Sequence, residues 1–305
     1  MRILLAGASG FLGTRLADRL RHQGHQVTRL VRRSAQAPDE ASWTPSAGRL
    51  DQSVIGAADA VINLAGAGVG DKRWTPRYRD LIRSSRVDST GTIARAIAAL
   101  PAADRPRVLL NGSAVGWYGD TGDRESAEDA PAGTGFLADV CRDWEAAARP
   151  AEEAGVRVAL LRTGLPLDAH GGLLKPQMTL FRLGLGGKLG NGRQWVPWIA
   201  LDDWLDAVTF LLEHDEIAGG VNLVGPAPVI NATFTEVFGK LLHRPAVMPI
   251  PGFALQLVLG EFAGETLRSQ RVVPGVLREA GFSWRYPTLE PALRAALEHR
   301  PSAAV

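Results

Sequence analysis

A run of three evenly spaced glycines near the N-terminus is the feature of this sequence best suited to chemistry. Gly7, Gly10 and Gly13 lie between a short apolar segment and an amphipathic one. Residues without a Cβ atom permit a tight turn and let backbone N–H groups approach a diphosphate closely. The N-terminal end of a helix adds free N–H groups and a partial positive charge. The spacing therefore predicts a dinucleotide-binding loop, with a purely structural turn as the alternative.

The residues after the next apolar segment indicate which dinucleotide would bind. A site for NAD usually has an Asp or Glu there, which binds the ribose 2′-hydroxyl. This chain has Arg32 and Arg33 instead, and its next acid is Asp39. A guanidinium binds a phosphate through two hydrogen bonds and suits a bare hydroxyl poorly. We therefore expect NADP(H) as the cofactor; the alternative is two arginines on a solvated loop.

Alternating strands and helices are predicted to hold this loop in place. Short apolar runs indicate strands, and apolar residues at helical spacing indicate helices. The predicted strands are 2–6, 26–31, 59–65, 107–112 and 156–162, and the predicted helices between them are 11–22, 76–100 and 136–154. Strand–helix alternation of this kind is typical of an α/β fold, a Rossmann-type doubly wound parallel sheet.

The sequence changes character after residue 164. Residues 164–198 are rich in Gly, Pro and Trp, which favours a loop-rich segment facing a substrate. One helix (203–213) and one strand (220–224) follow, and then a mainly helical end with helices predicted at 233–243, 252–260, 274–280 and 288–297. We therefore predict an NADP-binding Rossmann core of residues 1–165, to which 200–225 return, and a smaller, mainly helical substrate lobe of residues 166–199 and 226–300.

Composition excludes several classes of function. The 305 residues carry 34 Lys and Arg against 32 Asp and Glu, which gives no electrostatic reason to expect nucleic acid or an anionic membrane as a partner. Cys141 is the only cysteine, so an intrachain disulfide and a multi-cysteine zinc site are impossible. The six histidines lack metal-ligand spacing, and no apolar run approaches the ~20 residues that span a bilayer. We expect a cytoplasmic protein with a small-molecule substrate and no metal; the oligomeric state stays open.

Eight longer motifs add a resemblance to a known family. They are GASGFLG (7–13), NLAG (63–66), SRVDST (85–90), GSAVGWYGD (112–120), LADVCRDWEAAA (137–148), LLRTGLPL (160–167), FRLGLGGKLGNGRQWVPWIALDD (181–203) and SQRVVPGVLREAGFSW (269–284). On these motifs, residues 1–298 resemble the extended short-chain dehydrogenase/reductases. More narrowly, they resemble an atypical NAD(P)-dependent epimerase/dehydratase-like subfamily with a C-terminal domain of unknown function. The resemblance implies a nucleotide-binding oxidoreductase.

The resemblance also assigns residues to the cofactor. It implies that the diphosphate is held by Gly7, Ser9, Gly10, Phe11, Leu12 and Gly13. The 2′-phosphate would face Arg32 and Arg33, and the adenine and ribose side would be lined by Leu64, Ala65 and Gly66. The nicotinamide would be flanked by Arg162, Thr163, Gly164, Leu165 and Pro166. Arg86 would reach the cofactor from the opposite wall; the alternative for it is an exposed arginine on a helix.

Enzymes of this superfamily use a Tyr-x-x-x-Lys pair, which this chain lacks. In that pair the lysine tunes the tyrosine as an acid or base, because a nearby cation favours the phenolate. The residues four positions after Tyr78, Tyr118 and Tyr286 are Ile82, Gly122 and Glu290. The remaining catalytic candidates are Ser113, in the place of the serine that orients the substrate, and Tyr118, which would donate a proton unless it is a packed or surface tyrosine. Cys141 lies on the helix where the pair would be, and for it a buried thiol is favoured over a nucleophile.

The Gly-rich segment contains side chains that could hold a substrate. Arg182, Lys188 and Arg193 would bind an anionic group, and Trp195 and Trp198 would provide flat apolar walls. The alternative is that these aromatic side chains pack the two parts of the protein together.

Two functions remain open on the sequence alone. The leading hypothesis is an NADP(H)-dependent, epimerase-like oxidoreductase acting on an unknown small molecule, in which Ser113, with Tyr118, polarises a carbonyl group. The alternative is a catalytically inactive protein that binds or senses NADP(H). The missing Tyr–Lys pair favours the alternative, and the basic, tryptophan-rich segment favours a substrate site.

Overall fold

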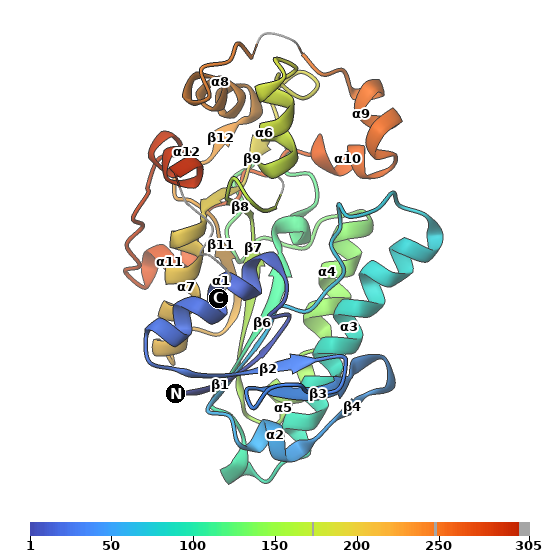
Figure 1. Ribbon diagram of the computed structural model, residues 1–305, viewed down its shortest axis with the longest axis vertical. Helices are drawn as coiled ribbons and strands as arrows, with labels where there is room; N and C mark the ends of the chain where they lie inside the picture. The colour runs from blue at the N-terminus through green and yellow to red at the C-terminus, as the bar shows by residue number, and fades with distance from the viewer. Residues whose placement is uncertain (173, 247–248, 299–305) are drawn as a thin grey trace.

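An eight-stranded sheet forms the centre of the molecule, as the computed structural model shows (Figure 1). The structure describes residues 1–298 apart from 173 and 247–248; residues 299 and 300, with which the predicted substrate lobe ends, lie outside the described residues. The strand order is β11-β7-β6-β5-β1-β2-β3-β4, and every pair is parallel except β3 with β4. This order, which reverses beside β1, is that of a Rossmann-type doubly wound α/β fold and confirms the predicted fold class.

Most strands of this sheet are short apolar runs, which suit strands buried on both faces. They are β1 (Arg2–Ala6), β2 (Gln26–Val31), β3 (Glu40–Thr44), β4 (Arg49–Leu50), β5 (Ala60–Asn63), β6 (Val108–Ala114), β7 (Arg157–Thr163) and β11 (Gly219–Leu223). Because the central strands run parallel, their carboxyl ends meet at one edge of the sheet. Ligands bind at that edge in folds of this kind.

Helices cover both faces of the sheet (Figure 1). One face carries α1 (Phe11–His22), α7 (Leu201–Glu213) and the short α11 (Gly275–Glu279). The other carries α2 (Gln52–Gly56), α3 (Pro76–Ala98), α4 (Phe136–Ala146) and α5 (Arg149–Glu153). Alternate residues of β1 divide between the two cores: Ile3 and Leu5 pack with α1 and α7, whereas Leu4 and Ala6 pack with α3. The two-residue period of a strand therefore builds a core on each side.

A smaller lobe lies beyond one end of the sheet (Figure 1). It contains two short strand pairs, β8 (Leu165–Leu167) with β10 (Trp198–Ala200) and β9 (Trp195–Val196) with β12 (Val229–Ile230). Its helices are α6 (Leu174–Arg182), α8 (Asn231–Leu241), α9 (Gly252–Leu259), α10 (Phe262–Thr266) and α12 (Leu289–Glu298). Phe181, Phe234 and Phe238 pack at the centre of this lobe.

Three local differences separate the structure from the sequence prediction. The expected helix 136–154 is two helices, α4 and α5, because Pro150, near the start of α5, has no N–H for a continuous run of helical bonds. The segment 164–198, expected to be mainly loop, contains α6, two short strands and the first residue of a third. A β3–β4 hairpin of five and two residues and the five-residue α2 lie where no element was predicted, since elements this short show little periodicity.

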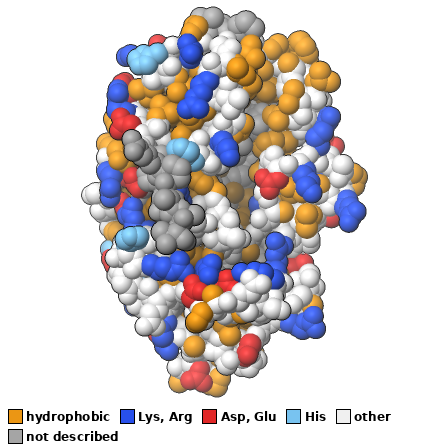
Figure 2. Space-filling view, in the orientation of Figure 1, with side chains coloured by type: hydrophobic (Ala, Val, Ile, Leu, Met, Phe, Trp, Pro, Cys, Tyr) orange, Lys and Arg blue, Asp and Glu red, His pale blue; other side chains and the backbone are white. Residues whose placement is uncertain are grey.

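Helix α9 has an unusually apolar surface. It exposes Phe253, Leu257 and Val258, and Figure 2 shows hydrophobic side chains gathered at that end of the molecule. The helix is only eight residues long. Among the helices that the structure describes, none combines the length and the apolar character needed to cross a membrane.

Candidate functional site

The glycine loop lies at the carboxyl end of β1, and backbone geometry explains two of its glycines. Gly7 has a φ of +82°, and a Cβ there would lie 2.6 Å from the carbonyl carbon of Leu64. A Cβ on Gly13 would lie 2.1 Å from the Gly7 carbonyl oxygen. Gly10 is different: its φ is −80°, and within 4 Å a Cβ there would meet only the Gly7 oxygen, at 3.3 Å. The loop is therefore open at position 10, directly before the first residue of α1.

The other residues of this loop have different surroundings. Ser9 is exposed, whereas Leu12 is half-buried against the core on the α1 face of the sheet. Phe11 lies against the turn at Gly171, where a Cβ would be 2.2 Å from its ring. The smaller lobe thus reaches the start of α1, beside the predicted phosphate position.

The two arginines after β2 are not equivalent. Both are exposed, but Arg33 forms two hydrogen bonds of 2.7 Å with the carboxylate of Glu40 on β3. This contact is the main reason why the pKa of the Glu40 carboxyl is lowered to about 2. Arg32 forms no side-chain hydrogen bond or ion pair with any described residue. Of the two arginines predicted to face a 2′-phosphate, Arg32 is therefore the available one, and Glu40 is a neighbour that the sequence argument overlooked.

A buried polar network fixes the edge of the sheet next to the glycine loop. The side-chain amide of Asn63, at the end of β5, donates to Thr90 of α3 at 2.9 Å and to Asn111 of β6 at 2.8 Å. The Asn63 side-chain oxygen accepts the backbone N–H of Ala65 at 3.1 Å. All three polar side chains are buried. They hold in place the residues predicted to line the ribose side, Leu64, Ala65 and Gly66.

Arg86, on α3, is not the exposed helix arginine that the alternative reading described. Its Nη1 donates to the carbonyl oxygens of Ala67 and Ile82, at 2.9 Å each. Its guanidinium carbon lies 5.0 Å from the centre of the Trp144 ring on α4, and a Cβ on Gly66 would lie 3.1 Å from that carbon. Burial lowers the pKa of Arg86. The guanidinium is enclosed between the end of β5 and α4.

Ser113 and Tyr118 belong to one buried hydrogen-bond network near the ends of β6 and β7. The Ser113 hydroxyl donates to Glu145 of α4 at 2.6 Å, and Glu145 accepts two hydrogen bonds from the Arg162 guanidinium, at 2.9 and 3.1 Å. Arg162 also donates to the Tyr118 hydroxyl at 3.0 Å, and that hydroxyl donates to Asn222 of β11 at 2.7 Å. The network connects β6, β7, β11 and α4 around one buried ion pair.

Comparison with known families decides the relationship that the motifs suggest. The profile of the NAD dependent epimerase/dehydratase family matches residues 3–225, and that of a domain of unknown function (DUF1731) matches residues 250–296. The chain belongs to the NAD dependent epimerase/dehydratase family. The resemblance drawn from the sequence motifs is thereby confirmed.

Relatives of this epimerase-family protein align along nearly its whole length. Epimerase family protein ML0860 of Mycobacterium leprae is 42% identical over 301 residues, which cover 98% of this chain and 96% of the relative. The crystal structure of human epimerase family protein SDR39U1 (isoform2) with NADPH is 32% identical, with a TM-score of 0.89, and the match covers 98% of this chain and 100% of that one. The crystal structure of a nucleoside-diphosphate sugar epimerase from Corynebacterium glutamicum is 34% identical, with a TM-score of 0.81, over 97% of this chain and 58% of that one.

The surroundings of Tyr118 contradict its predicted role in this epimerase-family protein. The side chain is fully buried, and its hydroxyl is engaged by Arg162 and Asn222. Burial raises the pKa of Tyr118, and the neighbouring Arg162 opposes this effect. The burial and the two engaged partners favour the packed tyrosine that the sequence offered as the alternative to a proton donor.

The hydroxyl of Ser113 is oriented differently from the sequence expectation. Its partner Glu145, paired with Arg162, is a carboxylate and can only accept, so the serine must donate to it. Only the lone pairs of the Ser113 oxygen then remain for a ligand. The prediction that Ser113 polarises a carbonyl group therefore needs correction, because its hydroxyl is arranged to accept a hydrogen bond from a ligand. The residue as a whole is 4% exposed.

The α4 face that a Tyr–Lys pair would occupy in this epimerase-family protein carries neither residue type. A Cβ on Gly116, in the short η3 helix (Val115–Tyr118), would lie 3.3 Å from Leu137 and 3.5 Å from the sulfur of Cys141. Burial raises the pKa of Cys141 to about 12, so the thiol is neutral near pH 7. Cys141 is the buried thiol that the sequence favoured.

Residues 163–166 carry the chain from the main sheet into the smaller lobe. The Thr163 hydroxyl accepts the indole N–H of Trp204 at 3.1 Å. A Cβ on Gly164 would lie 2.2 Å from the carbonyl oxygen of Pro197, and the next residues pair with β10. These residues begin at the carboxyl end of β7, at the edge of the sheet that also holds the glycine loop. Their contact with a nicotinamide stays a prediction.

The five residues predicted to hold a substrate have different surroundings. Trp198 is 1% exposed, and its indole N–H donates to the carbonyl oxygen of Ala227 at 3.0 Å, so the prediction of a ligand wall is wrong for this core residue. Trp195 is half-buried; its indole N–H donates to Asp123 at 2.9 Å, and the Arg271 guanidinium lies 4.7 Å from its ring centre. The three basic residues are exposed: Arg182, Lys188 and Arg193.

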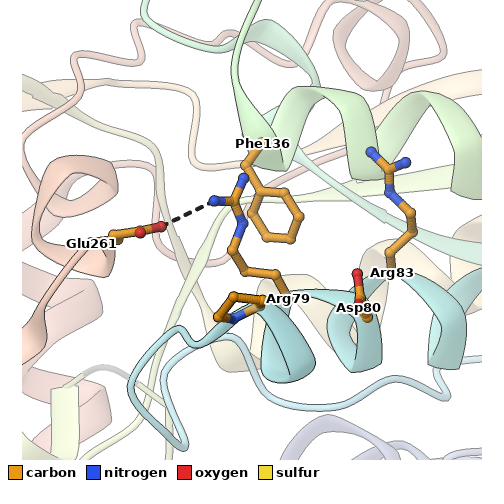
Figure 3. Close-up of a pocket in the computed structure, with 6 residues that line it drawn as sticks. Arg79, Asp80, Arg83, Phe136 and Glu261 are labelled. Carbon is orange, nitrogen blue, oxygen red and sulfur yellow. Dashed lines mark hydrogen bonds and ion pairs between the residues drawn. The ribbon is translucent and has the colours of Figure 1, made fainter.

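Two of the surface cavities that lie away from the glycine loop contain charged side chains of both signs. One, of about 230 Å³, is lined by Lys188, Ala232, Thr235, Glu236, Arg244 and Ala246. The other, of about 300 Å³, is lined by Pro76, Arg79, Asp80, Arg83, Phe136 and Glu261 (Figure 3). There the Arg79 guanidinium lies 4.4 Å from the Phe136 ring centre and 3.1 Å from Glu261, so its charge is already engaged. Of the predicted substrate residues, Lys188 alone lines either cavity.

Glu145 is the most informative residue that the sequence argument missed. It lies four positions after Cys141, so helical spacing places both on the inner face of α4. An acid on an otherwise apolar helix face is a signal for a buried partner of opposite charge. Asn222 carried no comparable signal, because it meets Tyr118 across 104 residues of sequence.

Proposed function

We propose that this protein is an NADP(H)-dependent oxidoreductase of the epimerase type that acts on an unidentified small molecule. The observation that carries this proposal is the open glycine loop after β1, together with the available guanidinium of Arg32 after β2. In a Rossmann-type fold the first feature receives the diphosphate and the second distinguishes the group on the ribose 2′-position. The structure of human SDR39U1 with NADPH supports the same cofactor.

The residues present fit this cofactor. Gly7 and Gly13 leave no room for a side chain, and the space over Gly10 is open at the start of α1. When bound, the nicotinamide would supply or accept a hydride. Ser113 would accept a hydrogen bond from a substrate hydroxyl, because its own hydrogen is held by Glu145. The protein would thereby orient an alcohol group rather than polarise a carbonyl.

A second function, NADP(H) binding without catalysis, has specific observations in its favour. No tyrosine of the sequence is followed four residues later by a lysine. The α4 face toward η3 presents Leu137 and a neutral Cys141, and Tyr118 is fully buried. A protein that reports the level of NADP(H) would need the cofactor site and no proton donor.

The cofactor assignment is tested by titrating the purified protein with NADPH and with NADH. A hydrogen bond to a charged group is worth about 1.5–3 kcal/mol, so NADPH should bind roughly ten to a hundred times more tightly. Arg32→Ala should remove most of this preference. Arg294→Ala, which changes an exposed arginine of α12, should leave it intact. Equal affinities of the wild-type protein for the two dinucleotides would refute the assignment of NADP(H).

The choice between enzyme and sensor needs a turnover measurement. The protein is incubated with NADPH and a panel of carbonyl compounds, and with NADP⁺ and the matching alcohols, while absorbance of the reduced nicotinamide is followed. Turnover that Ser113→Ala abolishes supports the enzyme. Tight NADPH binding without turnover across the panel supports the sensor.

A further inference from the structure

The cavity beside α8 contains charged side chains that are not paired with one another. Lys188, Glu236 and Arg244 line this cavity of about 230 Å³. None of the three forms a side-chain hydrogen bond or an ion pair with any residue that the structure describes. In the cavity of Figure 3, by contrast, the side chains of Arg79 and Glu261 lie 3.1 Å apart and neutralise each other. The charges beside α8 are therefore available to a ligand.

Thr235 gives a second, independent sign of a ligand at this cavity. The residue lines the cavity although only 5% of its surface is exposed. A threonine inside a helix can donate its hydroxyl to the carbonyl oxygen four residues earlier, as Thr209 of α7 does to Leu205 at 3.0 Å. The Thr235 hydroxyl has no such partner within the part of the chain that the structure describes, and it is not sealed from the surface. This buried residue therefore offers a hydrogen-bonding group to the cavity.

The C-terminal end of α8 turns the chain back toward Thr235. The backbone N–H of Arg244 donates to the carbonyl oxygen of Gly239 at 3.0 Å, a bond of the Schellman type that ends a helix. His243, with a φ of +52°, is the one described residue other than glycine in the left-handed region. A Cβ on Gly239 would lie 2.9 Å from both the Arg244 carbonyl oxygen and the Cβ of Ala246. The chain thus folds tightly against α8 one turn after Thr235, and its backbone is strained at His243.

Lys188 reaches the same cavity from the Gly-rich segment. A Cβ on Gly192 would lie 3.0 Å from Cδ of Lys188 and 3.1 Å from Cβ of Ala232, so the stem of Lys188 lies beside the first turn of α8. The next residue, Leu189, donates its backbone N–H to the side chain of Asn231 at 2.8 Å. The start of α8 therefore holds this part of the Gly-rich segment in place. In Figure 1, α8 lies in the smaller lobe, at the end away from the sheet.

The side chains around the cavity suit a small ligand that carries both charges. Lys188 and Arg244 can bind the oxygens of a carboxylate. Glu236 can only accept hydrogen bonds, so it suits an ammonium group and disfavours a multiply charged anion such as phosphate. The methyl groups of Ala232 and Ala246 provide an apolar part. Pockets for drug-sized ligands measure ~300–1,000 Å³, so this smaller cavity suits a molecule of a few carbon atoms.

We propose that the cavity beside α8 binds a small α-amino acid. Its carboxylate lies between Lys188 and Arg244, and its ammonium group donates to Glu236. The Thr235 hydroxyl donates to the carboxylate. This site goes beyond the proposed function, because it does not involve the glycine loop and does not depend on NADP(H).

The test is a calorimetric titration with three probes: L-alanine, propionate, which is L-alanine without the ammonium group, and inorganic phosphate. The variants are Arg244→Met, Glu236→Gln and Thr235→Val. The control is Lys240→Met, because Lys240 is exposed on the same helix and does not line the cavity. Melting temperatures are recorded for every variant. The control should leave the affinity for L-alanine within twofold of the wild-type affinity.

The wild-type protein should bind L-alanine with a dissociation constant on the order of 1 mM or below, and more tightly than propionate or phosphate. Arg244→Met should weaken the binding of L-alanine roughly ten- to hundredfold, because a hydrogen bond between charged groups is lost. Glu236→Gln should reduce the affinity for L-alanine to that for propionate, since propionate has no group that donates to Glu236. Thr235→Val should weaken the binding of L-alanine roughly two- to tenfold.

Several results would overturn the proposal. One is the absence of L-alanine binding at millimolar concentrations. Another is propionate or phosphate binding to the wild type as tightly as L-alanine does, because the site would then recognise an anion alone. A third is an unchanged affinity of Arg244→Met for L-alanine, with or without a lower melting temperature. If Arg244→Met does not fold, Glu236→Gln decides, because Glu236 is exposed; an unchanged affinity of that variant for L-alanine overturns the proposal.

Discussion

Replacing Gly10 with alanine should separate cofactor binding from folding. The φ of −80° at this position suits any residue, and a Cβ there would have one close neighbour, the Gly7 carbonyl oxygen at 3.3 Å. A Gly→Ala change at a compatible position stabilises a protein by about 0.4–1 kcal/mol, because the unfolded chain loses conformational freedom. The close oxygen offsets part of this gain. We therefore expect the free energy of unfolding to change by less than about 1 kcal/mol.

The same methyl group should weaken the binding of NADPH. It would occupy the open space at the start of α1 through which a phosphate approaches the backbone N–H groups. Loss of one hydrogen bond to a charged group costs about 1.5–3 kcal/mol, so the affinity for NADPH should fall roughly ten- to hundredfold. Gly13→Ala should behave differently, because its Cβ would lie 2.1 Å from a backbone oxygen. Forcing an atom into such a space costs about 1–3 kcal/mol or more of folding stability.

The assay pairs urea denaturation, which gives the free energy of unfolding, with a fluorescence titration of NADPH. Gly264→Ala, in α10, is the matched control, because a Cβ there would meet no atom within 4 Å. It should leave the NADPH affinity at the wild-type value and raise the free energy of unfolding by at most about 1 kcal/mol. If the affinity of Gly10→Ala for NADPH is within twofold of the wild-type affinity, the reasoning about the open loop is refuted. Gly10→Ala that unfolds as easily as Gly13→Ala would refute the reasoning about its geometry.

Three further predictions concern buried groups. Burial raises the pKa of Cys141 to about 12, so this thiol should not react with a thiol reagent in the native protein. In denaturant the single cysteine should react once per chain. Rapid labelling of the native protein would contradict the burial of Cys141. Arg162→Met should lower the free energy of unfolding by about 3–5 kcal/mol, since it leaves the Glu145 carboxylate buried without a cation. In urea denaturation, the double variant Arg162→Met with Glu145→Gln should lose less of this free energy than Arg162→Met alone. An equal or larger loss would speak against the ion pair. Burial raises the pKa of Asp203 from 3.8 to about 6, so the fold favours its neutral form, and the stability of the wild type relative to Asp203→Asn should rise as the pH falls from 7 to 4. A pH-independent difference between those two proteins would count against this assignment.

The sequence predicted the positions of the main strands and helices well where local periodicity was strong. Helix 11–22 and strands 2–6 and 26–31 have the bounds expected from their apolar spacing. Prediction was weaker where an element is short or is broken by a proline, as at Pro150 and in the β3–β4 hairpin. Those elements depend on contacts with the rest of the protein more than on their own pattern.

Predictions for the site differed according to how local the interaction is. The need for glycine at positions 7 and 13 follows from a strand–turn–helix segment of a few residues, which the sequence shows directly. The partners of Arg33 and Tyr118 were not visible in this way, because a charge or a hydroxyl gives no sign of which distant group will neutralise or bind it. Glu40 pairs with Arg33, and Asn222 engages the phenol of Tyr118.

By itself, the sequence determined the class of fold, the glycine loop and the family, since these depend on patterns that are contiguous along the chain. Only the tertiary structure decided that Trp198 is core, that the Ser113 hydroxyl points to Glu145 and that the Arg86 guanidinium lies between Gly66 and Trp144. These properties arise from burial and from hydrogen-bond geometry between segments far apart in the sequence. Both are set when the sheet and its helices pack together.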